Sequence, residues 1–287
     1  MDVALAVRGR FDPGIFAFLA ARAVNGVEDA GPAHYARALA LPGGHGWFAV
    51  DWDGHGLHLR AQVEDDGDLP ELRRRVRHLF NLDADLDAVD QALAADPLLA
   101  PRVAAVPGIR LPGCVDPGEI LIRAMIGQQI TVAAARSTLH QLAVLGTPSS
   151  LPHGALVGLF PSPPQLAERG REILRGPARR IDSVVSVAGM LADGSLKLSI
   201  EDTVESLAAT LMPVAGIGPW TVGYVAMRVL GAPDVFLPTD AAVRNGYARL
   251  TADGAKPTPK ELQRASEAWA PWRSYATLHL WRAAAGN

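Results

Sequence analysis

The spacing of apolar residues changes once along the chain, near Leu86, and this change limits the folds open to it. Before Leu86, Val3–Val7 alternates like a strand, and Gly46–Asp53 and Leu57–Val63 are typical of strands that meet at a turn. After it, apolar residues recur at spacings of three, four and seven, as on one face of a helix. The sequence therefore predicts an α+β fold, in which a sheet is followed by an all-helical body.

The first part, residues 1–88, also contains two predicted helices. One covers Ile15–Val24, after Asp12 and Pro13, and the other is the arginine-rich segment Leu69–Phe80. We expect an antiparallel sheet with these helices on one face.

The second part, residues 89–287, has a helical pattern throughout, with a proline-rich connector over Leu151–Pro164. The pattern over Gly118–Val144 is broken near Gly127, and Thr131 is placed to cap the helix that restarts there. Later helices are predicted from near Gln165 and over Val204–Leu211, Trp220–Leu230, Ala241–Leu250, Pro259–Trp269 and Ser274–Ala285. We expect two helical subdomains, one over 112–230 and one that joins 89–111 to 231–287.

Composition excludes several classes of protein. The single cysteine, Cys114, cannot form an internal disulfide, an iron–sulfur cluster or a cysteine-based zinc site, and it suits a reducing cytoplasm. No apolar stretch reaches roughly 18 residues, so a membrane span is not expected. The net charge of −3 argues against a protein that coats nucleic acid. Residues 1–111 hold 11 Lys and Arg against 16 Asp and Glu, whereas 112–287 hold 16 against 14, so a polyanion is better placed on the second part.

A Gly-x-Gly-Pro turn, Gly216-Ile217-Gly218-Pro219, lies between two predicted helices. The two glycines open backbone angles closed to other residues and allow close approach, while Ile217 can fold back to hold the helices together. The following helix, with Thr221 in its first turn, presents unpaired N–H groups and a positive dipole end to an anion. The pattern indicates a phosphate site built from backbone, although an isolated turn of this kind is also typical of a simple helix C-cap.

A carboxylate follows this turn at a distance of 20 residues, counted from Trp220. The segment DVFLPTD (234–240) brings Asp240 to the start of the next predicted helix. From spacing alone, Asp240 fits a helix N-cap as well as a functional acid, and the two roles are compatible. The pairing of a phosphate-binding turn with a nearby acid favours a functional role for both.

Six segments, taken together, carry a resemblance that covers nearly the whole chain. They read FLAARAV (18–24), LPGCVD (111–116), RAMIGQQ (123–129), VAGIGPWT (214–221), DVFLPTD (234–240) and PWRSYATLHLW (271–281). In this order they resemble the bacterial 3-methyladenine DNA glycosylase II family, a branch of the helix-hairpin-helix glycosylases with a Gly-Pro-Asp-type loop. The resemblance implies an N-terminal domain like the TATA-binding protein over 1–88 and a helix-hairpin-helix catalytic region over 89–287.

The resemblance also implies a reaction. Alkylation at a ring nitrogen makes the base a good leaving group, so the enzyme mainly needs a negative charge beside the sugar and an oriented water. Asp240 matches the family's catalytic aspartate. The expected partner is double-stranded DNA with bases of the 3-methyladenine or 7-methylguanine type, which are hydrolysed off after base flipping, in base excision repair. No cofactor is expected for the chemistry.

Further site residues follow from the same resemblance. Phe18, Trp220, Tyr224 and Trp281 are assigned to the pocket for the flipped cationic base, which electron-rich rings attract. Relatives that also cut the strand carry a lysine where Trp220 stands, so a hydrolytic enzyme without lyase activity is expected. The family often places another aromatic residue after the aspartate; Ala241 stands here instead, which leaves the base preference open.

Two more features of the resemblance concern how DNA is held. The loop with Gln128 and Gln129 aligns with the one that enters the gap left by the departed base, although a helix kink with solvated glutamines fits the same residues. The backbone carbonyls of Met212, Val214 and Ile217 stand where the family holds a structural monovalent metal ion against a DNA phosphate.

Other residues receive different roles. Arg22 and Arg273 are expected in internal ion pairs, and Arg244 fits either a phosphate contact or a solvated helix face. In several bacteria such enzymes follow a methyltransferase domain that needs several cysteines. Because the chain has only Cys114, direct methyl transfer is excluded for these residues. The start of the chain at its first strand fits either a short form or a fragment of such a fusion.

Three alternatives stay open. A non-catalytic DNA-binding protein would keep the glycines but need neither Asp240 nor the aromatic residues. A related glycosylase for oxidised or mispaired bases is disfavoured by Trp220 and by the lack of a cysteine cluster. A helical scaffold would use the hairpin for protein contacts. The enzyme interpretation predicts a monomer in the bacterial cytoplasm, at the nucleoid.

Overall fold

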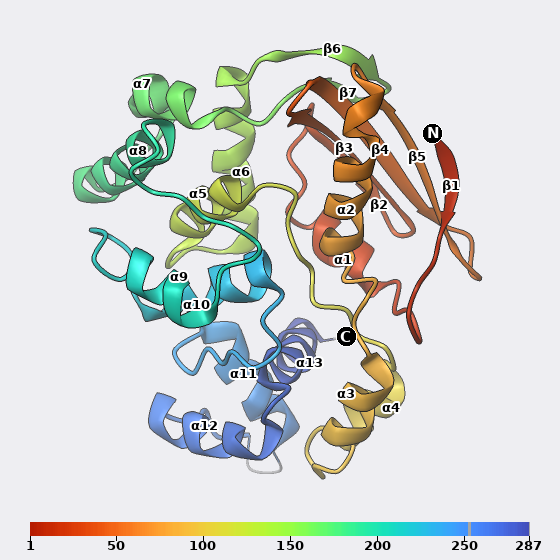
Figure 1. Cartoon of the computed structure of the whole chain (residues 1–287). Coiled ribbons are helices and arrows are strands. Elements are labelled where there is room, and N and C mark those ends of the chain that lie inside the picture. Colours follow the sequence, from red (N-terminus) through yellow and green to blue (C-terminus); the bar gives the residue numbers. More distant parts are fainter. Residues whose placement is uncertain (252–253, 287) are drawn as a thin grey trace.

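The computed structural model describes residues 1–251 and 254–286. The N-terminal part is built on a five-stranded antiparallel sheet with the strand order β1-β5-β4-β3-β2 (Figure 1). The strands are β1 (Asp2–Leu5), β2 (Glu28–Gly31), β3 (His34–Leu41), β4 (Gly44–Trp52) and β5 (Leu57–Val63). The predicted α+β class is confirmed.

Two strands of this sheet, β2 and β3, are not among those predicted from the sequence. β3 pairs with β4 along its whole length, with His34 opposite Asp51. Most of its residues are buried on both faces, so it lacks the alternation that identifies a half-exposed strand. The predicted helix over Ile15–Val24 is also too long. It ends at Ala20, and the chain then turns through Gly26, whose φ of +83° favours glycine, into β2.

Helices α1 (Gly14–Ala20) and α2 (Leu69–Leu79) lie on one face of the sheet (Figure 1). Phe16 of α1 and Val76 of α2 are fully buried in the same apolar cluster as Phe48 of the sheet. The arginine-rich segment therefore forms an amphipathic helix whose apolar side faces the sheet.

The other face of the sheet carries a two-stranded hairpin that the sequence pattern does not reveal. Its strands, β6 (Pro148–His153) and β7 (Leu156–Gly158), lie against β4 and β3 respectively. The imidazole ring of His153 stacks on the indole of Trp47, with 3.7 Å between ring centroids. The expectation that residues 89–287 are all helical is therefore wrong for this segment, because prolines and short strand length obscure the strand pattern.

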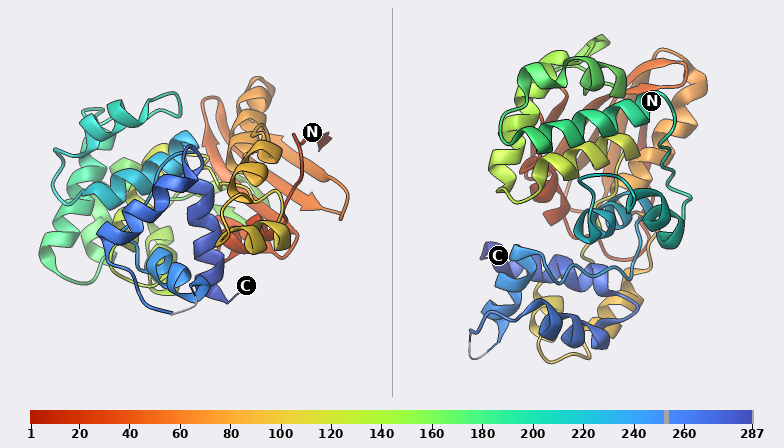
Figure 2. Two further views of the ribbon diagram at one scale, coloured as in Figure 1. Left: turned by 90° about the horizontal axis from the view of Figure 1, so that it is seen from below. Right: turned by 90° about the vertical axis from the view of Figure 1, so that its left-hand side faces the viewer.

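The rest of the described chain is helical (Figures 1 and 2). The helices are α3 (Leu86–Leu93), α4 (Ala100–Ala105), α5 (Pro117–Gly127), α6 (Val132–Leu142), α7 (Pro163–Ile173), α8 (Ala178–Ala192), α9 (Val204–Leu211), α10 (Pro219–Val225), α11 (Ala241–Leu250), α12 (Pro259–Ala265) and α13 (Arg273–Ala285). A π-helical turn over Ala226–Leu230 continues α10. Short 3₁₀ turns cover Asp66–Asp68, Ala143–Leu145 and Ser266–Trp269. None of the helices in the described ranges has the length and apolar character needed to cross a membrane.

The predicted break between α5 and α6 is confirmed. α5 ends at Gly127, and Thr131 caps α6 by accepting a hydrogen bond from the backbone N–H of Ala134 (3.1 Å). The loop between the two helices is therefore short and held at both ends.

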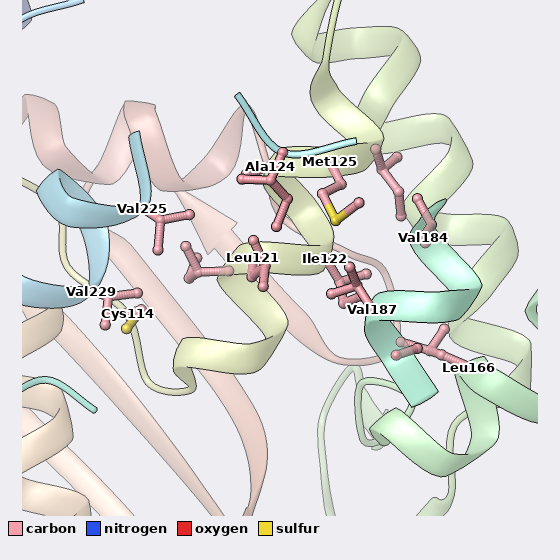
Figure 3. Close-up of a cluster of buried hydrophobic side chains, with 14 of the residues drawn as sticks. Cys114, Leu121, Ile122, Ala124, Met125, Leu166, Val184, Val187, Val225 and Val229 are labelled. Atoms are coloured by element: carbon pink, nitrogen blue, oxygen red, sulfur yellow. The ribbon is translucent and has the colours of Figure 1, made fainter. Parts of the chain in front are cut away.

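Two apolar clusters hold the helices together. One includes Leu121 of α5, Val187 of α8 and Val225 of α10 (Figure 3). The other joins α3 and α4 to α11, α12 and α13, and includes Trp269 and Leu280. The right-hand view of Figure 2 shows this second group of helices together at the lower end of the molecule.

Candidate active site

Three N–H groups converge on the carboxylate of Asp240. Oδ1 accepts hydrogen bonds from the backbone N of Val243 (2.9 Å) and from Nε1 of Trp281 (3.2 Å). Oδ2 accepts one from Nε1 of Trp220 (2.9 Å). The bond to Val243 makes Asp240 the N-cap of α11. Across the described residues this half-buried carboxylate has no ion-pair partner, so its hydrogen-bond donors are neutral.

The loop that carries Asp240 is positioned from α13. At the start of the loop, the hydroxyl of Ser274 accepts a hydrogen bond from the backbone N–H of Val235 (3.0 Å). α11 and α13 then pack so closely that a Cβ on Gly246 would lie 1.9 Å from a carbonyl oxygen of α13. Only glycine permits this approach, which brings Trp281 beside Asp240.

The four aromatic residues expected around a base lie together next to this carboxylate. Trp220 and Tyr224 stack with 5.3 Å between ring centroids, and Tyr224 lies 6.3 Å from Trp281. Phe18, which comes from α1, faces Trp281 with centroids 6.3 Å apart and planes 25° apart. A planar base that contacts a ring on each side needs about 7 Å between the rings, twice the carbon–carbon contact distance of about 3.5 Å. The Phe18 and Trp281 centroids lie closer together than that, and the guanidinium of Arg22 lies against the Phe18 ring.

Two arginines lie against the same rings. The guanidinium of Arg22 is 3.6 Å from the centroid of the Phe18 ring, and that of Arg228 is 5.1 Å from it. Arg228 also donates a hydrogen bond to the hydroxyl of Tyr224 (2.8 Å). Burial raises the pKa of Tyr224, but Arg228 and Arg22 outweigh burial and lower it. Burial is the main reason that the pKa of Arg22 is lowered.

Sequence reasoning missed Arg228 and misplaced Arg22. Arg228 is held by the carbonyls of Pro112 (2.6 Å) and Gly113 (2.9 Å), in a segment that the resemblance marked without assigning a role. The expected ion pair of Arg22 is wrong. Its guanidinium stacks on the ring of Phe18 and donates to that residue's carbonyl (3.0 Å).

The two glycines in the turn between α9 and α10 differ in backbone conformation and in surroundings. Gly216 has a φ of +86°, and a Cβ there would lie 2.6 Å from the hydroxyl of Ser183, so glycine is required on both counts. Ile217 folds back into the core with 8% exposure, as predicted. Gly218 has a φ of −125°, which suits any residue, and a Cβ there would meet nothing within 4 Å. The expectation of special backbone angles at both glycines is wrong for Gly218, which instead leaves open space at the turn.

The two glutamines of the α5–α6 loop point to different places. Nε2 of Gln128 donates to the carbonyl of Gly216 (2.9 Å) and to the hydroxyl of Thr221 (2.9 Å). The Thr221 side chain is 1% exposed, so its hydroxyl faces the protein. Gln129, with a φ of +58°, is exposed, and the following Ile130 is 38% exposed. Gln128 therefore binds the turn between α9 and α10, which is called the hairpin from here on, while Gln129 faces solvent.

The residues whose carbonyls are expected to hold a cation lie at the start of the hairpin. Met212 is the C-cap of α9, in the last turn, where carbonyls lack intrahelical partners. The carbonyl of Val214 accepts the N–H of Ile217 (3.1 Å) and keeps a second lone pair. Carbonyl oxygens suit a hard cation. No cluster of His, Cys, Asp and Glu that could hold a metal occurs in residues 1–251 and 254–286.

Three remaining residues are placed clearly. The ion pair expected for Arg273 is confirmed, since it binds both carboxylate oxygens of Asp234 (2.6 and 2.8 Å). Nε of Arg244 donates to the carbonyl of Pro257 (2.9 Å). Burial raises the pKa of the Cys114 thiol to about 12, so this thiol is a poor nucleophile.

The fold is that of the helix-hairpin-helix DNA glycosylases. A 3-methyladenine DNA glycosylase from Archaeoglobus fulgidus matches with a TM-score of 0.84 at 18% identity, covering 99% of this chain and 98% of that one. The Clostridium acetobutylicum 8-oxoguanine glycosylase/lyase in complex with DNA matches with a TM-score of 0.74 at 18% identity, covering 100% of this chain and 98% of that one. The Schizosaccharomyces pombe 3-methyladenine DNA glycosylase Mag1, in complex with abasic DNA, matches with a TM-score of 0.59 at 29% identity, covering 68% of this chain and 95% of that one.

Sequence comparison identifies the family within that class. Residues 2–116 match the family described as AlkA N-terminal domain. Escherichia coli DNA-3-methyladenine glycosylase 2 is 35% identical over 92% of this chain and 90% of its own length. The probable bifunctional transcriptional activator/DNA repair enzyme AlkA of Mycobacterium tuberculosis is 38% identical over 98% of this chain, which spans only 56% of that relative. The chain belongs to the DNA-3-methyladenine glycosylase II family.

Proposed function

We propose that the protein is a DNA glycosylase that hydrolyses the N-glycosidic bond of alkylated bases in duplex DNA, with Asp240 as the catalytic carboxylate. The observation that carries this proposal is the setting of that carboxylate, which two indole N–H groups hold beside four aromatic rings. The names of the E. coli and A. fulgidus relatives support a substrate of the 3-methyladenine type. We expect the protein to act as a monomer.

The reaction begins with a base that carries a positive charge from alkylation. As the bond between its nitrogen and the sugar C1′ breaks, the base takes the bonding electrons and leaves neutral, and the positive charge passes to the sugar. Asp240 places a negative charge next to that developing cation. Water then adds to C1′, and its proton passes to Asp240 or to solvent, which leaves an abasic site.

The base must leave the duplex to reach this carboxylate. We place it against the aromatic rings that include Phe18 and Trp281, where stacking and cation–π attraction favour a flat cation. Trp220 and Tyr224 would line the adjoining wall, because they stack on each other next to Trp281. Residues from both ends of the chain would therefore form the base pocket.

Strand cleavage is not expected from this site. Glycosylases that cut the strand form a Schiff base through a lysine amine, and Trp220 has no such nucleophile. Its indole instead donates to Asp240. Borohydride treatment during incubation with damaged DNA should trap no covalent adduct, and a trapped band would refute the hydrolytic assignment.

The hairpin would hold one DNA phosphate through backbone groups. The N–H groups of Trp220 and Thr221, in the first turn of α10, have no acceptor within the helix, and the open space at Gly218 lets a strand approach. A monovalent cation on the carbonyls of Met212, Val214 and Ile217 would supply positive charge beside that phosphate. Its role would be structural, with no part in bond cleavage.

We place Gln129, rather than Gln128, in the gap left by the extruded base. Gln129 is exposed, and its amide can hydrogen-bond the unpaired base while Ile130 adds apolar contact. Gln128 would link this loop to the phosphate-binding hairpin, since its side chain already binds Gly216 and Thr221.

A glycosylase for oxidised or mispaired bases is the second candidate, because the C. acetobutylicum 8-oxoguanine enzyme shares the fold. Trp220 disfavours the lyase form of that activity. A non-catalytic DNA-binding protein and a helical scaffold are less well supported, since neither would need Asp240 beside the aromatic rings.

Incubation with methylated duplex DNA, followed by chromatography of the released bases, tests the proposal. We expect release of 3-methyladenine and 7-methylguanine, and none with Asp240→Asn. Binding without release would favour the non-catalytic protein, and release only from oxidised or mispaired DNA would favour the second candidate. Failure to bind DNA would favour the scaffold.

A further inference from the structure

The two elements that would meet DNA carry no positively charged side chain. Neither the loop over 127–131 nor the hairpin over 212–221 contains lysine or arginine. Duplex DNA carries one negative charge per about 1.7 Å of its length, and lysine or arginine contacts to phosphate usually dominate affinity. A cation adjacent to these elements would therefore add strongly to the grip on DNA.

α8 lies next to both elements. Its apolar side, with Val184 and Val187, packs against α5 (Figure 3). Its first turn lies beside the end of α5, where the α5–α6 loop begins, since the guanidinium of Arg180 donates to the carbonyl of Ile126. One turn further along, Ser183 lies against the hairpin.

Arg179 lies on the side of α8 that faces the hairpin. Arg179 and Ser183 are four residues apart, so they share one face of the helix, and the Ser183 hydroxyl donates to the Arg179 carbonyl (3.0 Å). The hydroxyl of Ser183 would lie 2.6 Å from a Cβ at Gly216. Arg179 is therefore one helical turn from the tip of the hairpin, and it is exposed.

Arg175, in the connection before α8, is a second exposed cation. Its Nη1 donates to the carbonyls of Glu172 (2.8 Å) and Leu174 (3.0 Å), which holds the guanidinium at the end of α7. In contrast, Arg171 of α7 is paired with Asp182 (2.6 Å), so its charge is already compensated.

We propose that Arg179, supported by Arg175, binds a second DNA phosphate next to the one held by the hairpin. This inference rests on the proposed function. Contacts to phosphate carry no sequence or lesion information, so they strengthen binding to damaged and undamaged duplex alike. Two adjacent phosphate contacts would hold the backbone on the side of the loop that replaces the extruded base.

The experiment compares Arg179→Ala with Arg179→Lys and with Arg73→Ala, an exposed arginine on α2 that serves as a matched loss of charge. Binding to an undamaged duplex and to a duplex with an abasic site is measured over a range of salt concentrations. For Arg179→Ala the slope of log affinity against log salt should become shallower by about 0.9, as for one lost phosphate contact. The slope should stay at the wild-type value for Arg179→Lys and Arg73→Ala.

Two further readouts make the result decisive. Single-turnover base release at sub-saturating enzyme should be slower in Arg179→Ala and unchanged in Arg73→Ala, and Arg175→Ala should show a smaller change of slope in the same direction. An unchanged slope in Arg179→Ala, or an equal change in Arg73→Ala, would overturn the inference while wild-type DNA binding and base release stand. If the wild-type protein binds no duplex, the proposed function fails and the inference fails with it.

Discussion

Two carboxylates, Glu28 and Asp240, are held in opposite ways. Glu28 lies where the sheet meets α5, and it binds Arg37 (3.2 Å), Arg123 (2.7 Å) and the hydroxyl of Tyr35 (2.6 Å). Burial raises its pKa, but Arg123 and Arg37 outweigh burial and hold the pKa at about 2. Asp240 receives only two indole N–H groups and one backbone N–H.

The difference separates an acid paired with cations from an acid held by neutral donors. Around Glu28, two arginines cancel the charge, and Glu119 completes the network by binding both of them. Around Asp240, the hydrogen-bond donors are neutral, and Arg22 interacts with its charge without forming an ion pair. A negative charge in a fixed position, outside any ion pair, is what a developing sugar cation requires.

Asp240→Asn should have the largest effect, because it removes the charge and nearly keeps the shape. We expect base release to fall about a thousandfold or more, equivalent to about 4 kcal/mol of transition-state stabilisation, with duplex binding and thermal unfolding retained. Single-turnover release from methylated duplex measures this. Asp234→Asn is the matched control, since Asp234 lies in the same loop but pairs with Arg273. Near-normal release by Asp240→Asn would move the catalytic role to another residue.

Glu28→Gln should affect stability rather than chemistry. It leaves Arg37 and Arg123 with Glu119 as their acid partner, and breaking a buried ion pair costs about 3–5 kcal/mol. Denaturant unfolding measures the loss, and Glu172→Gln, in an exposed ion pair, should cost less than about 1 kcal/mol. Base release per folded molecule should stay near the wild-type value. If Glu28→Gln lost base release at unchanged stability, Glu28 would not be a purely structural acid.

Acid should weaken the fold in two stages. His279, whose pKa burial lowers to about 3, stays neutral in the fold and takes up a proton on unfolding once the pH falls below its ordinary 6.5. The contribution of Glu28 is complete above its ordinary pKa of 4.5 and is lost as the pH falls toward 2. Each proton changes the unfolding free energy by up to about 1.4 kcal/mol per pH unit. Denaturant unfolding from about pH 7 to about pH 3 should show a steeper fall below 4.5, because Glu71 and other carboxylates with lowered pKa values add to Glu28, and this fall should be smaller in Glu28→Gln; an identical profile in that variant would contradict this.

Trp220→Phe sharpens the contrast by keeping an aromatic ring and removing one donor to Asp240. We expect a loss of about tenfold in single-turnover base release, which is about 1.4 kcal/mol and typical of a hydrogen bond to a charged group. Trp269→Phe is the matched control, because its indole donates to Asp96 (2.8 Å), a different carboxylate. That variant should lose stability but not base release. Equal effects on release would mean that the bond to Asp240 has no particular role.

The two glycines of the α9–α10 turn should also divide into one that affects stability and one that affects DNA binding, with the smallest effect on binding. Gly216→Ala should lower the unfolding free energy by about 1–2 kcal/mol, because of its positive φ and its contact with Ser183. Gly218→Ala should unfold like the wild type but bind duplex several-fold more weakly, since its methyl group would occupy the open space at the turn. Unchanged affinity in Gly218→Ala would place the DNA elsewhere.

The features predicted correctly from the sequence depend on residues close along the chain. The cap at Thr131, the inward fold of Ile217 and the N-cap at Asp240 each involve contacts within a few residues. Helix boundaries such as Val204–Leu211 and Ala241–Leu250 follow from the same local periodicity.

The features that were missed depend on contacts between distant segments. β3 is buried on both faces because the β6–β7 hairpin covers one of them, so its pattern does not identify it as a strand. Arg228 gains its role from carbonyls at Pro112 and Gly113. The difference between Gln128 and Gln129 appears only once the hairpin lies beside their loop.

The amino-acid sequence alone predicted the class of fold and the Gly-x-Gly-Pro turn, because periodicity and short-range hydrogen bonds encode them, while the resemblance to a known family singled out Asp240 as the candidate acid. Packing of distant segments was needed to set Phe18 against Trp281 and to surround Asp240 with neutral donors while Glu28 received cations. The reason is physical. Ring spacing and the balance of charge around a buried group depend on which segments meet in space, and no local pattern records that.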